Sequence, residues 1–176
     1  MKKLLILIAI FGVAVFSIGD LYAASPLRAL NFNAGYVSPE DADGTWLAGM
    51  SFDFAIPTTN FQVTPFVNYW NISEEVSGIG SSDFTDWTVG GNVKYVIPTA
   101  AVSLSPYVAA GVSAHLMNAS VEALSFDESE TKFGWQAGAG LKWDRSSRWG
   151  LHAEGWYNGV ENFNHISAIG GVHINL

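Results

Sequence analysis

The sequence predicts an all-β fold, an eight-stranded antiparallel barrel in up-and-down order, and three observations favour it. Apolar and polar residues alternate with a period of two over runs of about ten residues, as in strands with one apolar face. The connections between these runs measure seven, four, fifteen, four, fifteen, five and seven residues. Outside the N-terminal leader, no segment shows helical periodicity. Long connections therefore gather at one end of the barrel and short turns at the other.

The first four strands are predicted at 30–36, 46–54, 61–70 and 87–97. The first alternates Leu, Phe, Ala and Tyr with Asn and Gly, and the second sets Trp, Ala, Met and Phe on one face. The third places Val and Tyr opposite Gln, Thr and Asn, and the fourth alternates Trp, Val and Tyr with Thr, Asn and Lys. The polar segment 71–85, between the third and fourth strands, is predicted to be a long loop.

The last four strands are predicted at 102–115, 132–143, 149–158 and 166–176. The fifth alternates Val, Leu and Ala with Ser, Tyr and His, and it leads into a second long loop, 117–131. The sixth and seventh meet across Asp-Arg-Ser-Ser-Arg, a short turn typical of an antiparallel hairpin. The eighth sets Ile, Ala, Val and Leu on one face and ends the chain.

An internal repeat relates two of the predicted hairpins. Residues 56–67 match residues 97–108 at an offset of 41, so the same hairpin geometry is expected twice. The repeat places Pro65 and Pro106 at equivalent positions inside strands. Because proline has no N–H for the ladder, a β-bulge is predicted at each.

The N-terminus predicts an exported protein. Two lysines precede an apolar run, 4–18, and small residues follow it. That run is shorter than the roughly 20 residues of a spanning helix, so residues 1–24 are predicted to be a cleaved signal peptide. Cleavage after Ala23 and cleavage after Ala24 both fit, and residues 25–176 form the predicted barrel domain.

Charge and cysteine content exclude several classes of protein. The leader holds two Lys and one Asp, so its removal changes the formal charge from −8 to −9. This acidic chain has no basic patch for nucleic acid. With no Cys, it has no disulfide framework, no thiolate metal site and no lipid-modified N-terminal cysteine.

The size of the apolar side chains predicts which face lies inside. An eight-stranded barrel is just wide enough for side chains to fill. Its interior could not also hold the large residues of the apolar face, which are Phe32, Tyr36, Trp46, Phe52, Phe54, Tyr69, Trp87, Tyr95, Phe133, Trp135, Trp143, Trp149 and Tyr157. The polar face is therefore predicted inside and the apolar face in lipid, which makes the fold a transmembrane β-barrel.

Aromatic residues at both ends of the apolar face support this prediction, since such girdles mark the two membrane interfaces. Toward the long loops they are Tyr36, Trp46, Tyr69, Trp87 and Tyr157. Toward the short turns they are Phe54, Phe61, Tyr95, Trp143 and Trp149. A closed barrel also leaves no backbone donor or acceptor open to lipid.

Four runs carry a resemblance to a known family: Ser-Pro-Tyr-Val-Ala-Ala-Gly at 105–111, Gly-Trp-Gln-Ala-Gly-Ala-Gly-Leu-Lys-Trp at 134–143, His-Ala-Glu-Gly-Trp-Tyr at 152–157 and Gly-Val-His-Ile-Asn-Leu at 171–176. The chain resembles the small outer-membrane β-barrel domain family, which includes opacity-like surface proteins and the eight-stranded barrels related to OmpX and to the OmpA transmembrane domain. The resemblance implies a bacterial outer membrane and a lumen closed by polar packing. The last run resembles the signal read by the β-barrel assembly machinery, with Leu176 where Phe is usual.

A polar network is predicted inside the lumen. Its members are Asp53, Lys94, Lys132, Lys142, His152 and Glu154. Unpaired charges would be costly there, so these groups are expected to pair and to stabilise the interior. A gated path for small solutes is the alternative use of the same groups.

No catalytic, cofactor or metal site is predicted. Enzymes occur on such barrels, and a nucleophile needs a base within hydrogen-bond reach. His165 with Ser167 and His152 with Glu154 are the candidate pairs. The second pair faces away from lipid, and His165 sits at a loop end. The four His lack metal-ligand spacing.

The long loops are predicted to form an acidic rim, since long loops on a rigid scaffold often carry function. The rim residues are Glu40, Asp41, Asp43, Glu74, Glu75, Glu122, Asp127, Glu128 and Glu130. Arg28, Arg145 and Arg148 fall at the turn end instead. The rim is expected to bind basic ligands, or to bridge to lipopolysaccharide phosphates through divalent cations.

Together these observations predict a non-enzymatic surface protein of the outer membrane, serving envelope integrity, surface interaction or adhesion. The long loops are expected outside the cell and both termini in the periplasm. Its predicted partners are outer-membrane lipids, lipopolysaccharide and the assembly machinery. A narrow porin for small solutes and a lipid-modifying enzyme are the alternatives.

Overall fold

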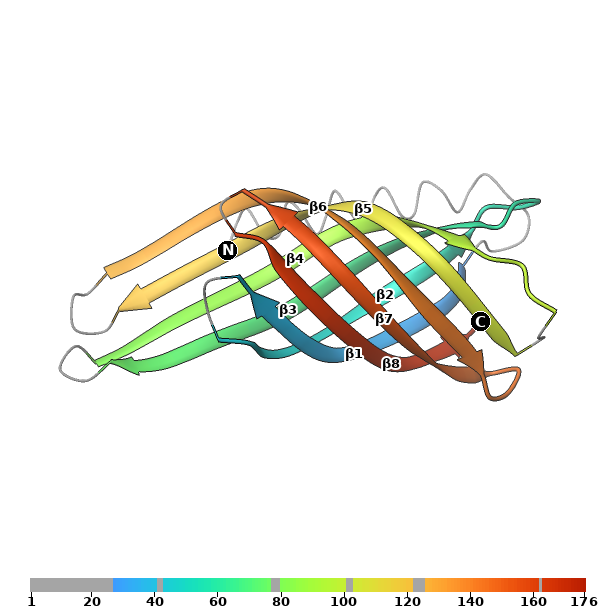
Figure 1. Cartoon of the computed structure of the whole chain (residues 1–176), viewed down its shortest axis with the longest axis horizontal. Helices are drawn as coiled ribbons and strands as arrows, with labels where there is room; N and C mark the ends of the chain where they lie inside the picture. Colours follow the sequence, from blue (N-terminus) through green and yellow to red (C-terminus); the bar gives the residue numbers. More distant parts are fainter. Residues whose placement is uncertain (1–26, 41–42, 77–79, 101–102, 122–125, 162) are drawn as a thin grey trace.

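The computed structural model describes residues 27–40, 43–76, 80–100, 103–121, 126–161 and 163–176, so the predicted signal peptide lies outside it. The eight strands are β1 (Leu27–Pro39), β2 (Thr45–Ala55), β3 (Phe61–Val76), β4 (Gly80–Val96), β5 (Leu104–Val121), β6 (Phe126–Asp144), β7 (Trp149–Val160) and β8 (His165–Asn175). Each pairs antiparallel with the next, and β8 pairs with β1, which closes the barrel (Figure 1). The predicted fold is confirmed. Among the described residues, no helix is long and apolar enough to cross a membrane.

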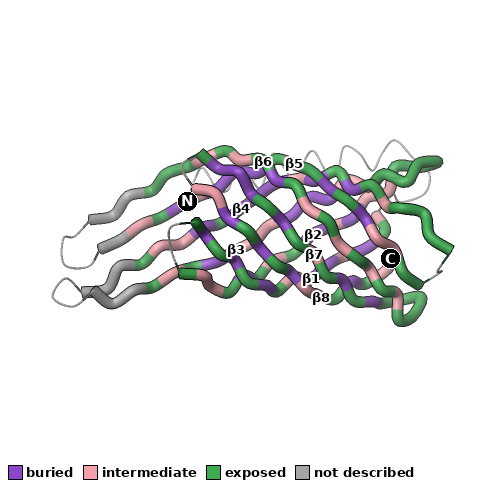
Figure 2. Tube along the Cα trace, in the orientation of Figure 1, coloured by how far each residue is buried: buried purple, intermediate pink, exposed green. Residues whose placement is uncertain are grey.

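Buried and exposed residues alternate along much of the barrel wall (Figure 2). The polar face lies inside. Asp53 and Lys94 are 0% and 1% exposed, whereas Trp46 and Phe133 are each 77% exposed. A soluble barrel would show the reverse pattern. The predicted inside-out arrangement is therefore confirmed, with the apolar face left free for lipid.

Aromatic residues on the outer surface pair across neighbouring strands at both ends of the apolar band. Ring centroids are 5.9 Å apart in Tyr36–Trp46, 4.8 Å in Tyr69–Trp87, 5.6 Å in Trp135–Tyr157 and 5.1 Å in Phe61–Tyr95. The first three pairs lie toward the long hairpins and the last toward the turns. All of these residues except Trp135 belong to the two predicted girdles.

The two predicted fifteen-residue loops are wrong, because most of each is strand. β3 and β4 stay paired up to Val76 opposite Gly80, and β5 and β6 up to Val121 opposite Phe126. Alternation detects a strand only where one face must be apolar. In the predicted loops the outward face turns polar, as at Asn71, Ser73 and Thr85, so the apolar outer face ends while the backbone ladder continues.

Four strands consequently rise above the rest of the barrel. β2 last pairs with β3 at Trp70, and β7 last pairs with β6 at Gly134. Past these residues β3, β4, β5 and β6 remain paired with one another, and their hairpins extend farthest from the barrel body (Figure 1). We call this extension, residues 71–76, 80–85, 118–121 and 126–133, the projecting sheet. Its two outer strands have no partner strand on their outer edges in the described structure.

The two predicted bulges at proline are also wrong. Pro65 stays in register with Gly91, and Pro106 with Leu141. On its other side, the β2–β3 ladder omits the pairs at Pro65 and Thr64 and resumes in the same register. Pro106 faces Ile97, which lies beyond the end of β4 and donates its N–H to the proline carbonyl at 2.8 Å. A proline in these strands therefore at most interrupts the ladder, without inserting a residue.

Inward glycines make room for the large inward side chains. A Cβ on Gly138 would lie 2.7 Å from Trp156 Cδ2, and one on Gly140 would collide with the Tyr107 ring. The narrow interior thus holds Trp156 and Tyr107 because the strand beside them carries no side chain there. Gly155 faces outward, and nothing lies within 4 Å of its Cβ position.

Replacing Gly138 by Ala should therefore destabilise the barrel, whereas Gly155→Ala should not. We expect a loss of about 1–3 kcal/mol for Gly138→Ala from overpacking, and a change within about 0.5 kcal/mol for Gly155→Ala. Urea unfolding of the barrel in lipid vesicles measures both. Equal stabilities of the two variants would contradict the packing described here.

Candidate functional site

The centre of the lumen is an ionic network built around Asp53. Its carboxylate pairs with Lys94, 3.5 Å away, and with Lys142. Thr64 Oγ1 donates to it at 2.7 Å and Asn31 Nδ2 at 3.0 Å. The side chains of Asp53 and Lys94 are 1% and 2% exposed. The predicted pairing of these lumen charges is present, and it links β1, β2, β3, β4 and β6.

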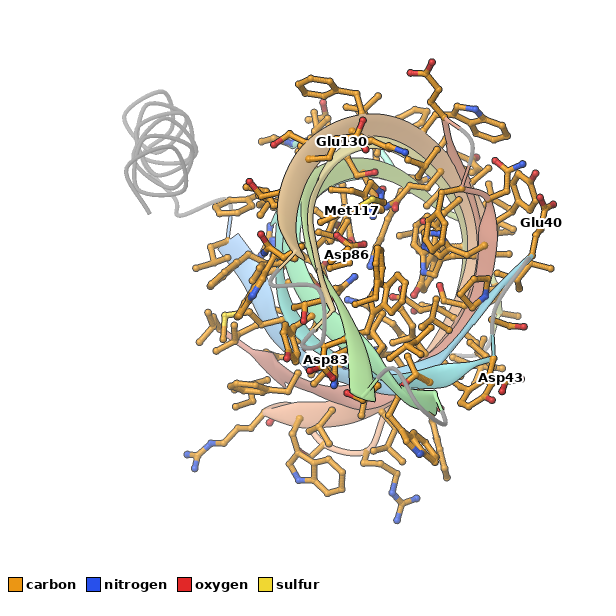
Figure 3. The ribbon with its side chains drawn as sticks, turned by 90° about the vertical axis from the view of Figure 1, so that its left-hand side faces the viewer. Glu40, Asp43, Asp83, Asp86, Met117 and Glu130 are labelled. Atoms are coloured by element: carbon orange, nitrogen blue, oxygen red, sulfur yellow. The ribbon has the colours of Figure 1, made fainter. Side chains whose placement is uncertain are left out.

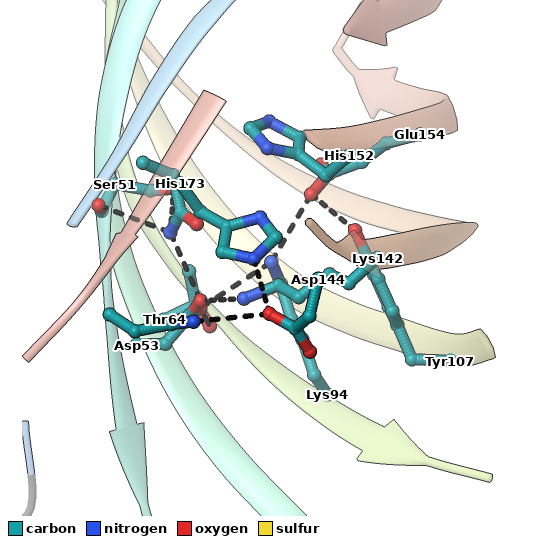
Figure 4. A network of polar contacts seen from close by, with 12 residues as sticks. Ser51, Asp53, Thr64, Lys94, Tyr107, Lys142, Asp144, His152, Glu154 and His173 are labelled. Atoms are coloured by element: carbon teal, nitrogen blue, oxygen red, sulfur yellow. Dashed lines mark hydrogen bonds and ion pairs between the residues drawn. The ribbon is translucent and has the colours of Figure 1, made fainter. Parts of the chain in front are cut away.

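Glu154 extends the network to the opposite wall. Lys94 Nζ lies 3.2 Å from Glu154 Oε1, and Trp156 Nε1 donates to Oε2 at 2.7 Å. The Tyr107 hydroxyl also donates to Glu154, and Lys94 Nζ lies 4.8 Å from the centre of the Tyr107 ring. Two lysines thus balance two carboxylates across the lumen (Figure 4). Tyr107 was not among the predicted members of the network, although the alternation along its strand places it on the inward face.

His152 lies in the lumen as predicted but bonds outside the ionic network. Its Nε2 is 3.0 Å from Asn33 Oδ1. Nearer the turns, His173 Nε2 lies 2.9 Å from Asp144 Oδ1, and Asn175 donates to the same oxygen at 3.1 Å. A second polar layer thus lies between the ionic network and the turn end (Figure 4).

Lys132 does not join the network, which corrects its predicted place. It pairs with Glu130 at 3.3 Å, and the two side chains are 20% and 60% exposed. β6 continues past the end of β7, so an inward-facing position there lies at the outer mouth. The alternation along β6 correctly placed Lys132 on the inward face. The predicted position along the barrel axis, level with the ionic network, was wrong.

A second buried polar group was missed in the sequence. His115 Nδ1 lies 2.7 Å from Asp86 Oδ2, and His115 Nε2 lies 3.0 Å from Ser113 Oγ. Thr88 Oγ1 donates to Asp86 at 3.0 Å. Asp86 lies two residues before Thr88 and therefore on the same inward face of β4. The predicted strand began only at residue 87, so Asp86 was not counted as inward-facing.

The hydrogen bonds join Ser113, His115 and Asp86 in the same order as in a Ser-His-Asp catalytic triad. Their burial leaves no place for a substrate. Asp86 and His115 are 0% exposed and Ser113 is 4% exposed. Ser113 packs under β6, where a Cβ on Gly134 would lie 3.3 Å from Ser113 Oγ. The arrangement therefore ties β4 to β5 and reaches no acyl group.

An aromatic plug closes the outer mouth of the lumen. Trp70, 1% exposed, stacks on Phe163 with ring centroids 5.8 Å apart, and Phe84 lies 5.4 Å from Trp70. His165 packs 5.8 Å from Phe163. Phe163 belongs to the connection between β7 and β8, where its N–H donates to the Val160 carbonyl at 3.0 Å.

Against the network lies a cavity of about 30 Å³, lined largely by amides and hydroxyls. Its lining includes Asn68, Asn92, Gln136, Lys94 and Glu154. That volume has room for one or two water molecules, since a single water needs roughly 10–15 Å³.

The predicted acidic rim is spread around the mouth. Glu40, Asp43, Asp83 and Glu130 are exposed and lie at separate places on the rim, with Asp86 inside (Figure 3). Positions 74, 75, 127, 128 and 130 belong to β3 and β6 and not to loops. Asp41 and Glu122 lie outside the described residues, as do the side chains of Glu74, Glu75, Asp127 and Glu128.

Metal ligation is the remaining chemistry that carboxylates and imidazoles could support. Among the residues that the structure describes, no three His, Asp or Glu side chains are placed to hold a metal ion. His115 and His165 lie close, with ring centroids 5.6 Å apart, and His115 is bonded on both ring nitrogens. The described geometry is that of a packed, cross-linked interior.

Family comparison agrees with this architecture. The model of the surface antigen family matches residues 57–175, which is more than half of the chain. The chain belongs to the surface antigen family. No relative of this surface antigen is found among curated proteins.

Three solved structures share the fold of this surface antigen. Neisserial surface protein A overlaps with a TM-score of 0.70 at 17% identity, covering 88% of this chain and 100% of that one. The N-terminal β-barrel domain of Pseudomonas aeruginosa OprF gives 0.56 at 18%, covering 84% and 97%. Ail, the attachment invasion locus protein of Yersinia pestis, gives 0.56 at 14%, covering 85% and 97%. Family and fold make the chain an outer-membrane β-barrel surface protein.

The network predicts that Lys94 and Lys132 differ sharply in importance. Lys94→Met leaves two carboxylates buried without their shared cation, which we expect to cost about 3–5 kcal/mol. Lys132→Met removes a partly exposed ion pair at the outer mouth and should cost at most about 1 kcal/mol. Denaturant unfolding in vesicles compares the two variants. Adding Glu154→Gln to Lys94→Met should restore part of the loss, and full additivity would argue against the described pairing.

Proposed function

We propose that this surface antigen is a non-enzymatic, non-conducting barrel that holds the projecting sheet outside the cell, where it contacts external molecules. One observation carries the proposal: an ionic network and an aromatic plug fill much of the lumen, while four strands extend well past them. A protein built this way would present its polar side chains to external molecules at its outer end. Its barrel serves as the anchor.

The packing of the lumen supports an anchor over a narrow porin. The ionic network joins opposite walls, and the aromatic plug closes the mouth above it. A porin would instead keep a continuous water-filled path. The cavity of about 30 Å³ is much too small for a solute larger than water.

The position of the candidate nucleophile weighs against a lipid-modifying enzyme. Ser167 and His165 are each 4% exposed and face the lumen, and Asn158 Nδ2 lies 3.5 Å from Ser167 Oγ. His152 and Glu154 face the same interior. Lipid substrates meet the outer wall, where none of these groups lies.

The polarity of the projecting sheet supports its placement in water outside the cell. Asn71, Ser73, Thr85 and Asn118 lie on the opposite face of these strands from Ile72 and Phe84. Outer-membrane barrels turn their short connections and termini toward the periplasm. The projecting sheet is then extracellular, and its exposed Asp83 and Glu130 favour partners with basic surfaces, or lipopolysaccharide phosphates bridged by divalent cations.

The C-terminal strand supports the proposed contact with the assembly machinery. Ile166, Val172, Ile174 and Leu176 of this segment are all exposed on the outer wall. Such a row of apolar side chains is open to recognition before the barrel enters lipid.

Proteolysis of intact cells tests the orientation. A glutamate-specific protease should cut at Glu40, Glu122 or Glu161 and spare Glu154, whose side chain is 9% exposed. An arginine-specific protease should spare Arg145 and Arg148 until the outer membrane is permeabilised. Fragments mapped by mass spectrometry identify the cuts. Cleavage at Arg145 or Arg148 in intact cells would mean that the turn end is the outer one.

Planar-bilayer recording tests the closed lumen. The folded barrel should show no discrete conductance steps, because two separate layers obstruct it. Phe163→Ala loosens the aromatic plug alone and should also remain silent, since the ionic network still crosses the lumen. Regular conductance steps from the unaltered protein would favour the porin alternative.

A further inference from the structure

The three arginines of the chain gather at the turn end of the barrel. Arg28 lies in β1, and Arg145 and Arg148 lie in the turn between β6 and β7. Asn175 N donates to the Arg148 carbonyl at 2.8 Å, and Leu176 N donates to the Arg28 carbonyl at 2.9 Å. The end of β8 therefore lies between Arg148 and Arg28. With adjacent strands about 4.8 Å apart, their backbones are about 10 Å apart.

These guanidinium groups are exposed and have no carboxylate partner in the described part of the chain. The neighbouring acid, Asp144, already accepts hydrogen bonds from His173 and Asn175. Arg145 lies over the Trp143 ring, 4.8 Å from its centre. Three cations without a carboxylate partner on one rim would attract an anion to this end of an otherwise acidic chain.

The surrounding aromatic residues place this rim at the depth of lipid headgroups. Trp143 and Trp149 are 43% and 45% exposed on the outer wall. Exposed tryptophans mark the membrane interface. An arginine beside them meets phosphate groups, for which its planar fork is well suited.

The opposite end of the barrel has the opposite charge. Its exposed, described ionisable side chains include Glu40, Asp43, Asp83, Glu130 and Glu161. Phosphate would be repelled there and attracted at the turn end. This asymmetry favours an anionic leaflet at one end only.

We propose that Arg28, Arg145 and Arg148 form a phosphate-binding rim for anionic glycerophospholipids in the leaflet at the turn end. The rim fixes the depth of the barrel in the membrane and complements the acidic outer end. Its assignment to the periplasmic leaflet rests on the orientation proposed above. The phosphate contact itself is tested in symmetric vesicles, where orientation has no effect.

The test measures lipid selectivity of the folded, full barrel in vesicles. Spin-labelled phosphatidylglycerol and spin-labelled phosphatidylcholine report how much of each lipid is held at the protein surface. The unaltered barrel should prefer phosphatidylglycerol, and Arg28→Gln, Arg145→Gln and Arg148→Gln together should abolish the preference. Each arginine should contribute up to about fivefold. Added salt should weaken the preference of the unaltered barrel only.

The matched control removes three charges from the other end, as Glu40→Gln, Asp43→Asn and Glu161→Gln. It should keep the full preference, and the gel mobility of unheated samples shows that each variant is folded. Retention of the preference by the arginine variant, or its loss in the control, would overturn the proposal. Tighter retention of lipid A than of phosphatidylglycerol would overturn the assignment to a phospholipid.

Discussion

Closure of the backbone hydrogen-bond ladder is the constraint on which the rest of the structure depends. In lipid an unpaired N–H or C=O has no water to bond, so a sheet must close. β8 meets β1 along eleven residue pairs, from Ala29 opposite Asn175 to Pro39 opposite His165. Eight closed strands then set the width of the interior. That width explains why glycines face Trp156 and Tyr107, and why the large apolar residues lie outside.

The polar side chains of the narrow interior stabilise the barrel because they bond to one another across the lumen. Each charge in the lumen must find a partner, and Asp53, Glu154, Lys94 and Lys142 do so across the barrel. The resulting network joins strands that are not neighbours in the ladder, while the Asp86–His115–Ser113 group joins two that are. The aromatic plug fills the lumen nearer the outer mouth.

In water, a strand at the edge of a sheet can leave its backbone groups without a partner strand. β3, β4, β5 and β6 continue as a paired sheet whose outer edges face water and need no partner strand. At the turn end the connections are short, and the arginines there lie close to the tryptophans and have no carboxylate partner in the described structure. The two ends therefore differ in length and in charge.

The sequence alone determined the number of strands, the face that each side chain occupies and both aromatic girdles, because a period of two is written directly in the side chains. It did not show how far β3 to β6 continue, since their outward face turns polar there, as at Asn71 and Thr85. The effect of Pro65 depended on which neighbour its missing donor faced. Which inward charges meet was decided by the register between strands, so Tyr107 joined the network and Lys132 did not. The register between strands, and how far each strand extends along the barrel, depend on the pairing of all eight strands, so the sequence of one strand does not predict them.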